Sequence, residues 1–168
     1  MPHHLQPSPV FRFRDLTQRA EFVHWRNAIR AEGKGIAFTN GVFDLLHKGH
    51  TSYLLEARNL GDVLVVGLNA DSSVRRLKGD TRPIQNEEDR AYILASLKAC
   101  DCVVIFDEDT PLDLIAALVP DILVKGGDYK IEDIVGKDIV ESNGGVVKTI
   151  PLVEGKSTTG IVEKMKQR

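Results

Sequence analysis

The sequence predicts an α/β fold, a doubly wound and Rossmann-like parallel sheet of five strands with helices on both faces. Short segments rich in valine, isoleucine and leucine alternate along the chain with segments that have helical periodicity. The apolar segments are nearly continuous, which is typical of parallel strands that are buried on both faces. There is no internal repeat and no low-complexity segment that would indicate another architecture.

The composition fits an ordinary globular domain and argues against several functions. The chain has 168 residues, of which 42% are hydrophobic and 27% charged, enough to bury a proper core. A net charge of −2 gives no basic field for nucleic acid or for an anionic membrane. No apolar run reaches the roughly 18 residues that a membrane span needs.

The two cysteines favour a reducing compartment. Cys100 and Cys102 lie only two residues apart near a predicted strand, a spacing that does not favour the geometry of a disulfide. A mutual disulfide is therefore not expected, and two cysteines do not make a zinc site. We expect a cytoplasmic protein.

The N-terminal region is expected to lie outside the main fold. Residues 1–14 lack the apolar stretch of a signal peptide and are predicted to be a flexible tail, and residues 15–168 a single domain. Residues 15–32 are predicted to form a helix that packs on this domain, because glycines follow its apolar positions as stop signals. These apolar positions are Leu16, Phe22, Val23 and Ile29.

The first half of the sheet is predicted from two apolar segments. Residues 35–39, GIAFT, and residues 62–69, DVLVVGLN, are expected to be buried strands. The segment between them, residues 50–61, has helical periodicity and ends in glycine, a common helix terminator. Two further helices are expected at 71–77 and 86–98, joined by a polar loop.

The second half repeats this alternation. Residues 110–119 are expected to form a helix with Thr110 at its N-cap and Pro111 at its first position, the places that these residue types favour. The remaining expected elements are strands 102–106, 121–127 and 146–150, short helical pieces within 131–145, and a last helix at 157–168.

Unusual polar residues follow the predicted strands, which indicates a binding site. In a doubly wound sheet, ligands bind at the carboxyl ends of the strands, near the point where the strand order reverses. Polar segments occupy residues 39–50 after the first strand, 69–71 after the second, 125–129 after the fourth and 157–159 after the fifth. We expect these four segments to meet at one edge of the sheet.

The segment HKGH, residues 47–50, suits phosphate groups. Gly49 lets a ligand approach the backbone, and the start of the predicted helix offers N–H groups and a partial positive charge. His47 and His50, three residues apart, can project to the same side and donate hydrogen bonds to neighbouring phosphates. The alternative is a helix-capping histidine and a core histidine.

The pattern G-x-F-D-x-x-H-x-G-H over residues 41–50, directly after a strand, resembles the signature of the H-x-G-H nucleotidyltransferase superfamily. Members transfer a nucleotidyl group from a nucleoside triphosphate to a phosphate or carboxylate and release pyrophosphate. The resemblance implies that His47 and His50 hold the triphosphate and stabilise charge at the α-phosphorus, without a covalent enzyme intermediate.

More of the chain is similar to a narrower group. The segments "GLNADSSVRRLKGDTRPI", "EEDRAYILASLKACDCVVIFDEDTP", "KGGDY" and "EGKSTTGIV" follow in the order and spacing of bacterial D-glycero-β-D-manno-heptose 1-phosphate adenylyltransferases. The likeness covers roughly residues 12–168 and resembles the stand-alone form. It implies ATP and a sugar 1-phosphate as substrates, Mg²⁺ held mainly by substrate and water, an ADP-heptose for lipopolysaccharide as product, and a homodimer.

The resemblance also implies roles for individual residues. His47, His50 and Lys78 are the expected catalytic residues, Lys78 as a flexible cation that closes over donor and acceptor. No metal ligand is expected. The nucleotide-binding residues are expected to be Thr39, Asn40, Gly41, Phe43, Gly49, Asn69, Arg90, Lys125, Gly126, Ser157, Thr158 and Thr159, and the acceptor-binding residues Asp44, Asp71, Arg82 and Asp128.

Several of these roles have structural alternatives. Lys78 can be a solvated surface lysine, and Arg90 can form a surface ion pair with Glu87. Asp44 can cap its own turn instead of placing a metal or the acceptor, and Asp71 can be a plain helix N-cap. The hydroxyls at 157–159 can be an ordinary N-cap.

Two rival functions remain open from the sequence. The first is a cytidylyltransferase that uses CTP and a small phosphorylated alcohol. Relatives of that type carry Arg-Thr-Glu-Gly-Ile before the Ser-Thr-Thr run, and this chain shares only Glu154 and Gly155 with it, which favours ATP. The second is a nucleotide-sensing module that binds without chemistry.

Overall fold

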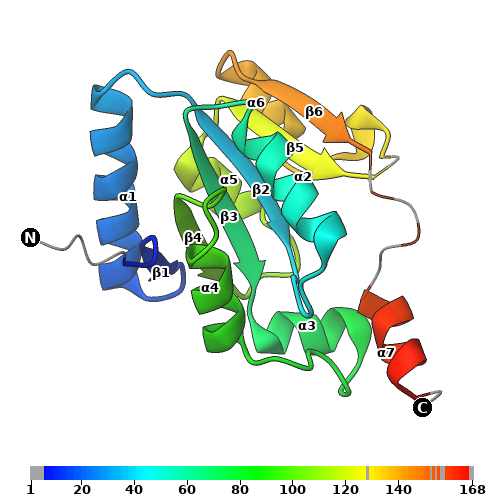
Figure 1. Ribbon diagram of the computed structural model, residues 1–168. Helices are drawn as coiled ribbons and strands as arrows, with labels where there is room; N and C mark the ends of the chain where they lie inside the picture. Colours follow the sequence, from blue (N-terminus) through cyan, green and yellow to red (C-terminus); the bar gives the residue numbers. More distant parts are fainter. Residues whose placement is uncertain (1–5, 128, 152, 154, 156–157, 167–168) are drawn as a thin grey trace, which may run out of the picture.

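Six strands form one parallel sheet in the part of the chain that the computed structural model describes, which is residues 6–127, 129–151, 153, 155 and 158–166. The order is β1-β4-β3-β2-β5-β6, so the order reverses between β2 and β5 (Figure 1). The doubly wound fold is confirmed, with one strand more than predicted. The strands are β1 (Val10–Arg12), β2 (Ile36–Gly41), β3 (Val63–Asn69), β4 (Cys102–Phe106), β5 (Ile122–Gly126) and β6 (Val146–Ile150).

Helices cover both faces of the sheet (Figure 1). One face packs against α2 (Lys48–Arg58) and α4 (Glu87–Ala95), and the other against α1 (Leu16–Ala31), α5 (Leu112–Leu118) and α6 (Lys137–Ser142). Neighbouring strand residues alternate between the two cores as the pleat requires. Cys100 precedes β4 and lies in one core, whereas Cys102, the first residue of β4, lies in the other, and both are free thiols.

The sixth strand lies in the segment that was expected to be a tail. Val10–Arg12 pairs in parallel with β4, and the following Phe13 is only 2% exposed. The prediction of a flexible segment is therefore wrong for residues 10–13. A three-residue strand carries too short a pattern to be recognised alone, and the open edge of β4 decides its conformation.

Other element boundaries also move. Helix α2 begins at Lys48, so His50 lies in its first turn rather than at its start. Helix α5 begins at Leu112 with Pro111 at the N-cap position, so the prediction of Thr110 as the cap is wrong. In α1, Asp15 caps the helix by accepting from two backbone N–H groups, whereas Leu16, one of the apolar positions of the predicted helix, is 79% exposed.

The carboxyl ends of β2, β3 and β5 lie at one edge of the sheet. The short α3 (Asp71–Lys78) follows β3 there, and α7 (Thr158–Lys166) lies beside α3 at the same end of the molecule (Figure 1). A single 3₁₀ turn, η1 (Ile131–Asp133), follows β5. Within the described ranges, no helix has both the length and the apolar character needed to cross a bilayer.

Replacing Phe13 tests whether the added strand belongs to the fold. Phe13→Ala removes a buried ring that also packs under the Arg19 guanidinium at 4.2 Å, and we expect the free energy of unfolding to fall by about 3–5 kcal/mol. The exposed Leu16→Ala should change it by less than about 0.5 kcal/mol. Urea unfolding measures both, and equal midpoints would contradict a structured segment.

Candidate active site

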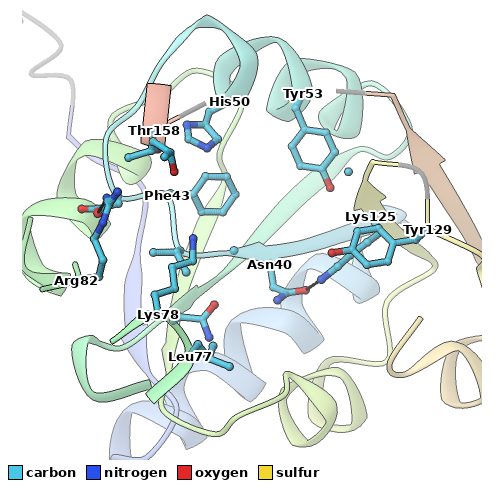
Figure 2. A pocket seen from close by; sticks show the side chains of 16 residues that line it. Asn40, Phe43, His50, Tyr53, Leu77, Lys78, Arg82, Lys125, Tyr129 and Thr158 are labelled. Atoms are coloured by element: carbon cyan, nitrogen blue, oxygen red, sulfur yellow. Dashed lines mark hydrogen bonds and ion pairs between the residues drawn. The ribbon is translucent and has the colours of Figure 1, made fainter. Parts of the chain in front are cut away.

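A cavity of about 710 Å³ opens at the carboxyl edge of the sheet, between β2 and β5, where the strand order reverses. Its walls come from the ends of β2, β3 and β5 and from the starts of α2 and α7, so the expected convergence of distant segments is present (Figure 2). The lining residues are Asn40, Gly41, Val42, Phe43, Asp44, His50, Tyr53, Asn69, Leu77, Lys78, Arg82, Lys125, Gly126, Tyr129, Thr158 and Thr159.

The two histidines stack at the entrance of α2. Their ring centroids are 3.9 Å apart with 17° between the planes, and Phe43 meets His50 edge-on at 5.4 Å. His47 occupies the N-cap position but its side chain makes no cap hydrogen bond, so it is not a capping histidine. His50 lines the cavity, whereas His47 stands behind it against its ring. Gly49 is buried between them in the first turn.

The surroundings of His50 keep its ring neutral at pH 7. Burial, then His47, then Lys78 lower the pKa of His50 to about 4. Two of these causes are electrostatic: Lys78 is positively charged, and His47 can become so. A bound anion between His50 and Lys78 would counter this positive charge, so the site is electrostatically suited to a phosphate group.

Tyr53, which the sequence analysis missed, fixes α2 to the sheet. Its hydroxyl lies 2.6 Å from the Thr39 hydroxyl and donates to the Val124 carbonyl at 3.3 Å. Burial raises the pKa of Tyr53 to about 12, so the phenol stays protonated. Thr39 is fully buried in this contact and does not line the cavity, so its expected nucleotide contact is replaced by a structural one. The sequence feature that could have indicated Tyr53 is its spacing, because a residue three positions after His50 lies on the same side of the helix.

Asp44 holds a second loop against the cavity. Its carboxylate accepts from the Arg82 guanidinium at 2.7 Å and from the backbone N–H groups of Ile84 and Gln85 at 2.8 and 3.0 Å. Burial alone would raise the pKa of Asp44, but these hydrogen bonds outweigh it and the pKa is lowered. Asp44 therefore neither caps its own turn nor keeps its oxygens open for a metal.

Arg90 fixes the same loop from behind. Its fully buried side chain donates to the Val42 carbonyl at 2.7 Å, to the Gln85 carbonyl at 3.0 Å and to the Asp71 carboxylate at 2.7 Å. Neither Arg90 nor Asp71 lines the cavity. Arg90 was expected to contact the nucleotide. In the structure its guanidinium group instead positions the loop through these three hydrogen bonds.

The alternatives weighed for these two residues are also wrong. Glu87 pairs with Arg12 at 2.6 Å rather than with Arg90. Asp71 is the first helical residue of α3, and Ala70 is the N-cap.

Two lysines face the cavity from the side opposite His50 (Figure 2). Lys78 is the last residue of α3 and points its amino group into the cavity, ahead of the Gly79 C-cap with φ of 90°. Lys125 donates to Asn40 Oδ1 at 3.0 Å and lies 5.8 Å from the Tyr129 ring. Burial lowers the pKa of Lys125.

The start of α7 adds hydroxyls to the site. Thr158 and Thr159 line the cavity, and the Thr158 hydroxyl donates to the Leu45 carbonyl at 3.3 Å, which joins α7 to the loop before α2. Asn69 lines it from the end of β3 and donates to the Ser73 hydroxyl at 3.0 Å. The predicted site residues Ser157 and Asp128 lie outside the described residues.

The protein groups do not form a metal cage by themselves. Within the described ranges, no three histidine, cysteine or carboxylate side chains gather as a metal site. Asp44, the acidic residue among those lining the cavity, has its oxygens engaged by Arg82 and two backbone groups.

The fold and the cavity define a nucleotidyltransferase. The family described as "Cytidylyltransferase-like" matches residues 38–164, and the chain belongs to this family of enzymes. Among curated proteins it is similar to the "Bifunctional protein HldE" of Syntrophotalea carbinolica, with 62% identity over 83% of this chain and 28% of that protein. The protein of the same name from Geotalea uraniireducens is 55% identical over 97% of this chain and 33% of its own length. The chain thus spans about a third or less of these relatives.

The chain is also similar to solved structures with the same fold. A lipopolysaccharide core biosynthesis protein from Thermoplasma volcanium is 31% identical with a TM-score of 0.60, over 74% of this chain and all of that one. A pantoate-β-alanine ligase from Francisella tularensis, 18% identical with a TM-score of 0.61 over 94% and 77% of the two chains, shares the fold.

The neutral state of His50 should appear in the pH dependence of stability. Its folded pKa of about 4 lies below the unfolded value, so the unfolded chain binds the extra proton as the pH falls from about 6.5 to 4. This contribution to stability is complete above that window and is lost progressively through it. His50→Gln should show a shallower fall of the urea midpoint between pH 6.5 and 4 than the parent.

The exposed His24 on α1 provides the matched control for this measurement. His24→Gln should follow the parent curve. Parallel curves for the parent and His50→Gln would show that His50 titrates normally in the folded protein.

Proposed function

We propose that this protein transfers the adenylyl group of ATP to D-glycero-β-D-manno-heptose 1-phosphate, giving ADP-heptose and pyrophosphate for lipopolysaccharide core synthesis. The observation that carries the proposal is the cavity in which His50, Lys78 and Thr158, from three distant segments, face one space. The sugar is supported by the sequence resemblance to heptose phosphate adenylyltransferases and by the structural match to a lipopolysaccharide core biosynthesis protein.

The chemistry is an in-line displacement at phosphorus. An oxygen of the sugar 1-phosphate attacks the α-phosphorus of ATP, the bond to the bridging oxygen breaks, and pyrophosphate leaves with that electron pair. The nucleophile is already an anion, so no strong general base is needed. The barrier lies in bringing two anions together, and positioning with charge neutralisation lowers it. ATP would enter as its magnesium complex, with the ion held by phosphates and water.

Each residue of the cavity would bind or neutralise a different part of the phosphates, according to its position. His50, with His47 stacked behind it, would donate to the triphosphate at the start of α2, where the helix dipole also favours anions. Lys78 would neutralise phosphates from the opposite side. Thr158 and Thr159 would receive the terminal phosphates at the start of α7. We propose that the reaction takes place in the cytoplasm, in keeping with two free, buried cysteines.

One experiment tests the proposal directly. The protein is incubated with Mg²⁺, with ATP or CTP, and with a panel of sugar 1-phosphates and glycerol 3-phosphate, and the products are identified by mass. ADP-heptose from ATP is the expected product. A CDP-alcohol from CTP would establish the rival cytidylyltransferase function instead.

Removing His50 should abolish most turnover without unfolding the protein. His50→Ala deletes a donor at the site of developing charge, and we expect kcat to fall by about 10²–10³-fold. The measurement is pyrophosphate release with ATP and the heptose phosphate. The matched control is His24→Ala on the exposed side of α1, which should retain parental activity. If His50→Ala kept the kcat of the parent protein, His50 would have no part in the catalytic mechanism.

Removing Lys78 should affect turnover much more than ATP affinity. Because Lys78 is exposed at the end of α3, we expect it to form its strongest contacts only as charge develops between donor and acceptor. Lys78→Ala should lower kcat by about 10²-fold or more, with a change in the Kd for ATP below about fivefold. Lys98→Ala, an exposed lysine remote from the cavity, is the control. An unchanged kcat in Lys78→Ala would show that Lys78 is a solvated surface lysine without a role in turnover.

A further inference from the structure

A smaller cavity of about 220 Å³ adjoins the main one and shares a wall with it. The shared residues are Asn40, Asn69, Leu77, Lys125 and Tyr129. The remaining walls come from the loop between β4 and α5 and from the segment after β5: Asp109, Thr110, Pro111, Leu123, Asp133, Ile134 and Val135. At about 30 Å³ per water molecule, the space equals roughly seven waters, which is too little for a nucleotide.

We propose that this side cavity, defined by the residues above, binds the uncharged polyhydroxyl part of the acceptor, with the acceptor phosphate at Lys125 where the two cavities meet. The proposal rests on the proposed function, because it assigns a place to the sugar of the sugar 1-phosphate. It adds Asp133, Thr110 and Val135 to the residues that would contact substrate, a role that the sequence did not indicate for any of them.

Charge distinguishes the two cavities. The main cavity is lined by Lys78 and by the ion pair of Asp44 with Arg82, and Lys125 stands on the wall that the two cavities share. Beyond this wall, the charged residues of the side cavity are the acidic Asp109 and Asp133. Carboxylates repel phosphate groups and accept hydrogen bonds strongly from hydroxyl groups. Phosphates therefore belong in the main cavity and a neutral polyol in the side cavity.

The two acidic residues are not equivalent. Asp109 pairs with Arg76 at 2.9 Å, which partly satisfies its carboxylate. Asp133, in the 3₁₀ turn η1, is exposed, and its carboxylate makes no ion pair with another described residue. Asp133 is thus the stronger acceptor for substrate hydroxyls and the better residue to test.

The shared wall supplies complementary groups. Asn40 Oδ1 accepts from Lys125, which leaves the amide N–H₂ of Asn40 as a donor. Asn69 donates through Nδ2 to Ser73, which leaves its Oδ1 as an acceptor. Leu77 and Val135, 53% and 40% exposed, provide apolar edges for the C–H faces of a sugar ring. Donors, acceptors and apolar edges together match a polyol better than a planar, hydrophobic base.

The test blocks the side cavity and removes its free carboxylate. Val135→Trp fills the space from an exposed position, and Asp133→Asn keeps the shape while removing the charge. In each variant of the full chain, the KM for D-glycero-β-D-manno-heptose 1-phosphate should rise by about tenfold or more, the effect of losing one charge-assisted hydrogen bond. The Kd for ATP, measured by calorimetry, should stay within about twofold because ATP does not enter this cavity.

Matched controls lie elsewhere on the surface. Val146→Trp changes an exposed valine on β6, and Asp138→Asn an exposed aspartate on α6, and both should retain the parental KM for the sugar phosphate. An unchanged sugar KM in Val135→Trp and Asp133→Asn, or an equal loss of ATP affinity, would overturn the assignment of the side cavity. A parent protein that turns over no sugar 1-phosphate would instead overturn the proposed function, so the two failures are distinguishable.

Discussion

Two partly buried ion pairs, Asp44 with Arg82 and Arg90 with Asp71, together with the Arg90 hydrogen bond to the Val42 carbonyl, hold the loop between β2 and α2 in one conformation. This loop carries Phe43 and delivers the histidines to the mouth of the cavity. Removing one partner of a buried pair leaves a charge without compensation, which typically costs about 3–5 kcal/mol. The loop is therefore rigid before any ligand binds, and the donors at the start of α2 do not need to be ordered during the reaction.

Rigidity extends from this loop through contacts that are not themselves part of the cavity. The Tyr53 hydroxyl ties α2 to the ends of β2 and β5, and the Thr158 hydroxyl joins α7 to the Leu45 carbonyl. Arg12 of β1 binds Glu87, which accepts from the backbone N–H of Asp71 at 2.6 Å. The short N-terminal strand is thus linked to the site by two further contacts, although it lies at the far edge of the sheet.

The electrostatics of the main cavity complement a polyanion. Lys78 helps to hold His50 neutral, and burial lowers the pKa of Lys125, so positive charge is costly there without a partner. In the proposed function, a triphosphate supplies that partner. The side cavity, with Asp109 and Asp133, would take the hydroxyl groups of the acceptor, so that one sheet edge would separate these groups from the phosphates.

The sequence by itself determined the alternation of strands and helices. Each predicted strand is a short apolar run, each predicted helix has helical periodicity, and both patterns depend only on residues that are close together along the chain. The sequence also placed His50, Lys125 and Thr158 at the carboxyl edge, because parallel strands all end on one side, whereas Lys78 was expected from the family resemblance. Figure 2 shows these groups around one space.

Only the tertiary structure decided which polar residues face that space. Arg90, Asp71 and Thr39 have the residue types of ligand contacts, yet their partners lie far along the chain and bury them behind the wall. Strand β1 and the role of Asp133 and Val135 in the side cavity could not be predicted, for the same reason. A three-residue edge strand and an exposed 3₁₀ turn have no periodic pattern, so long-range pairing with β4 and the fold of the segment after β5 set their positions.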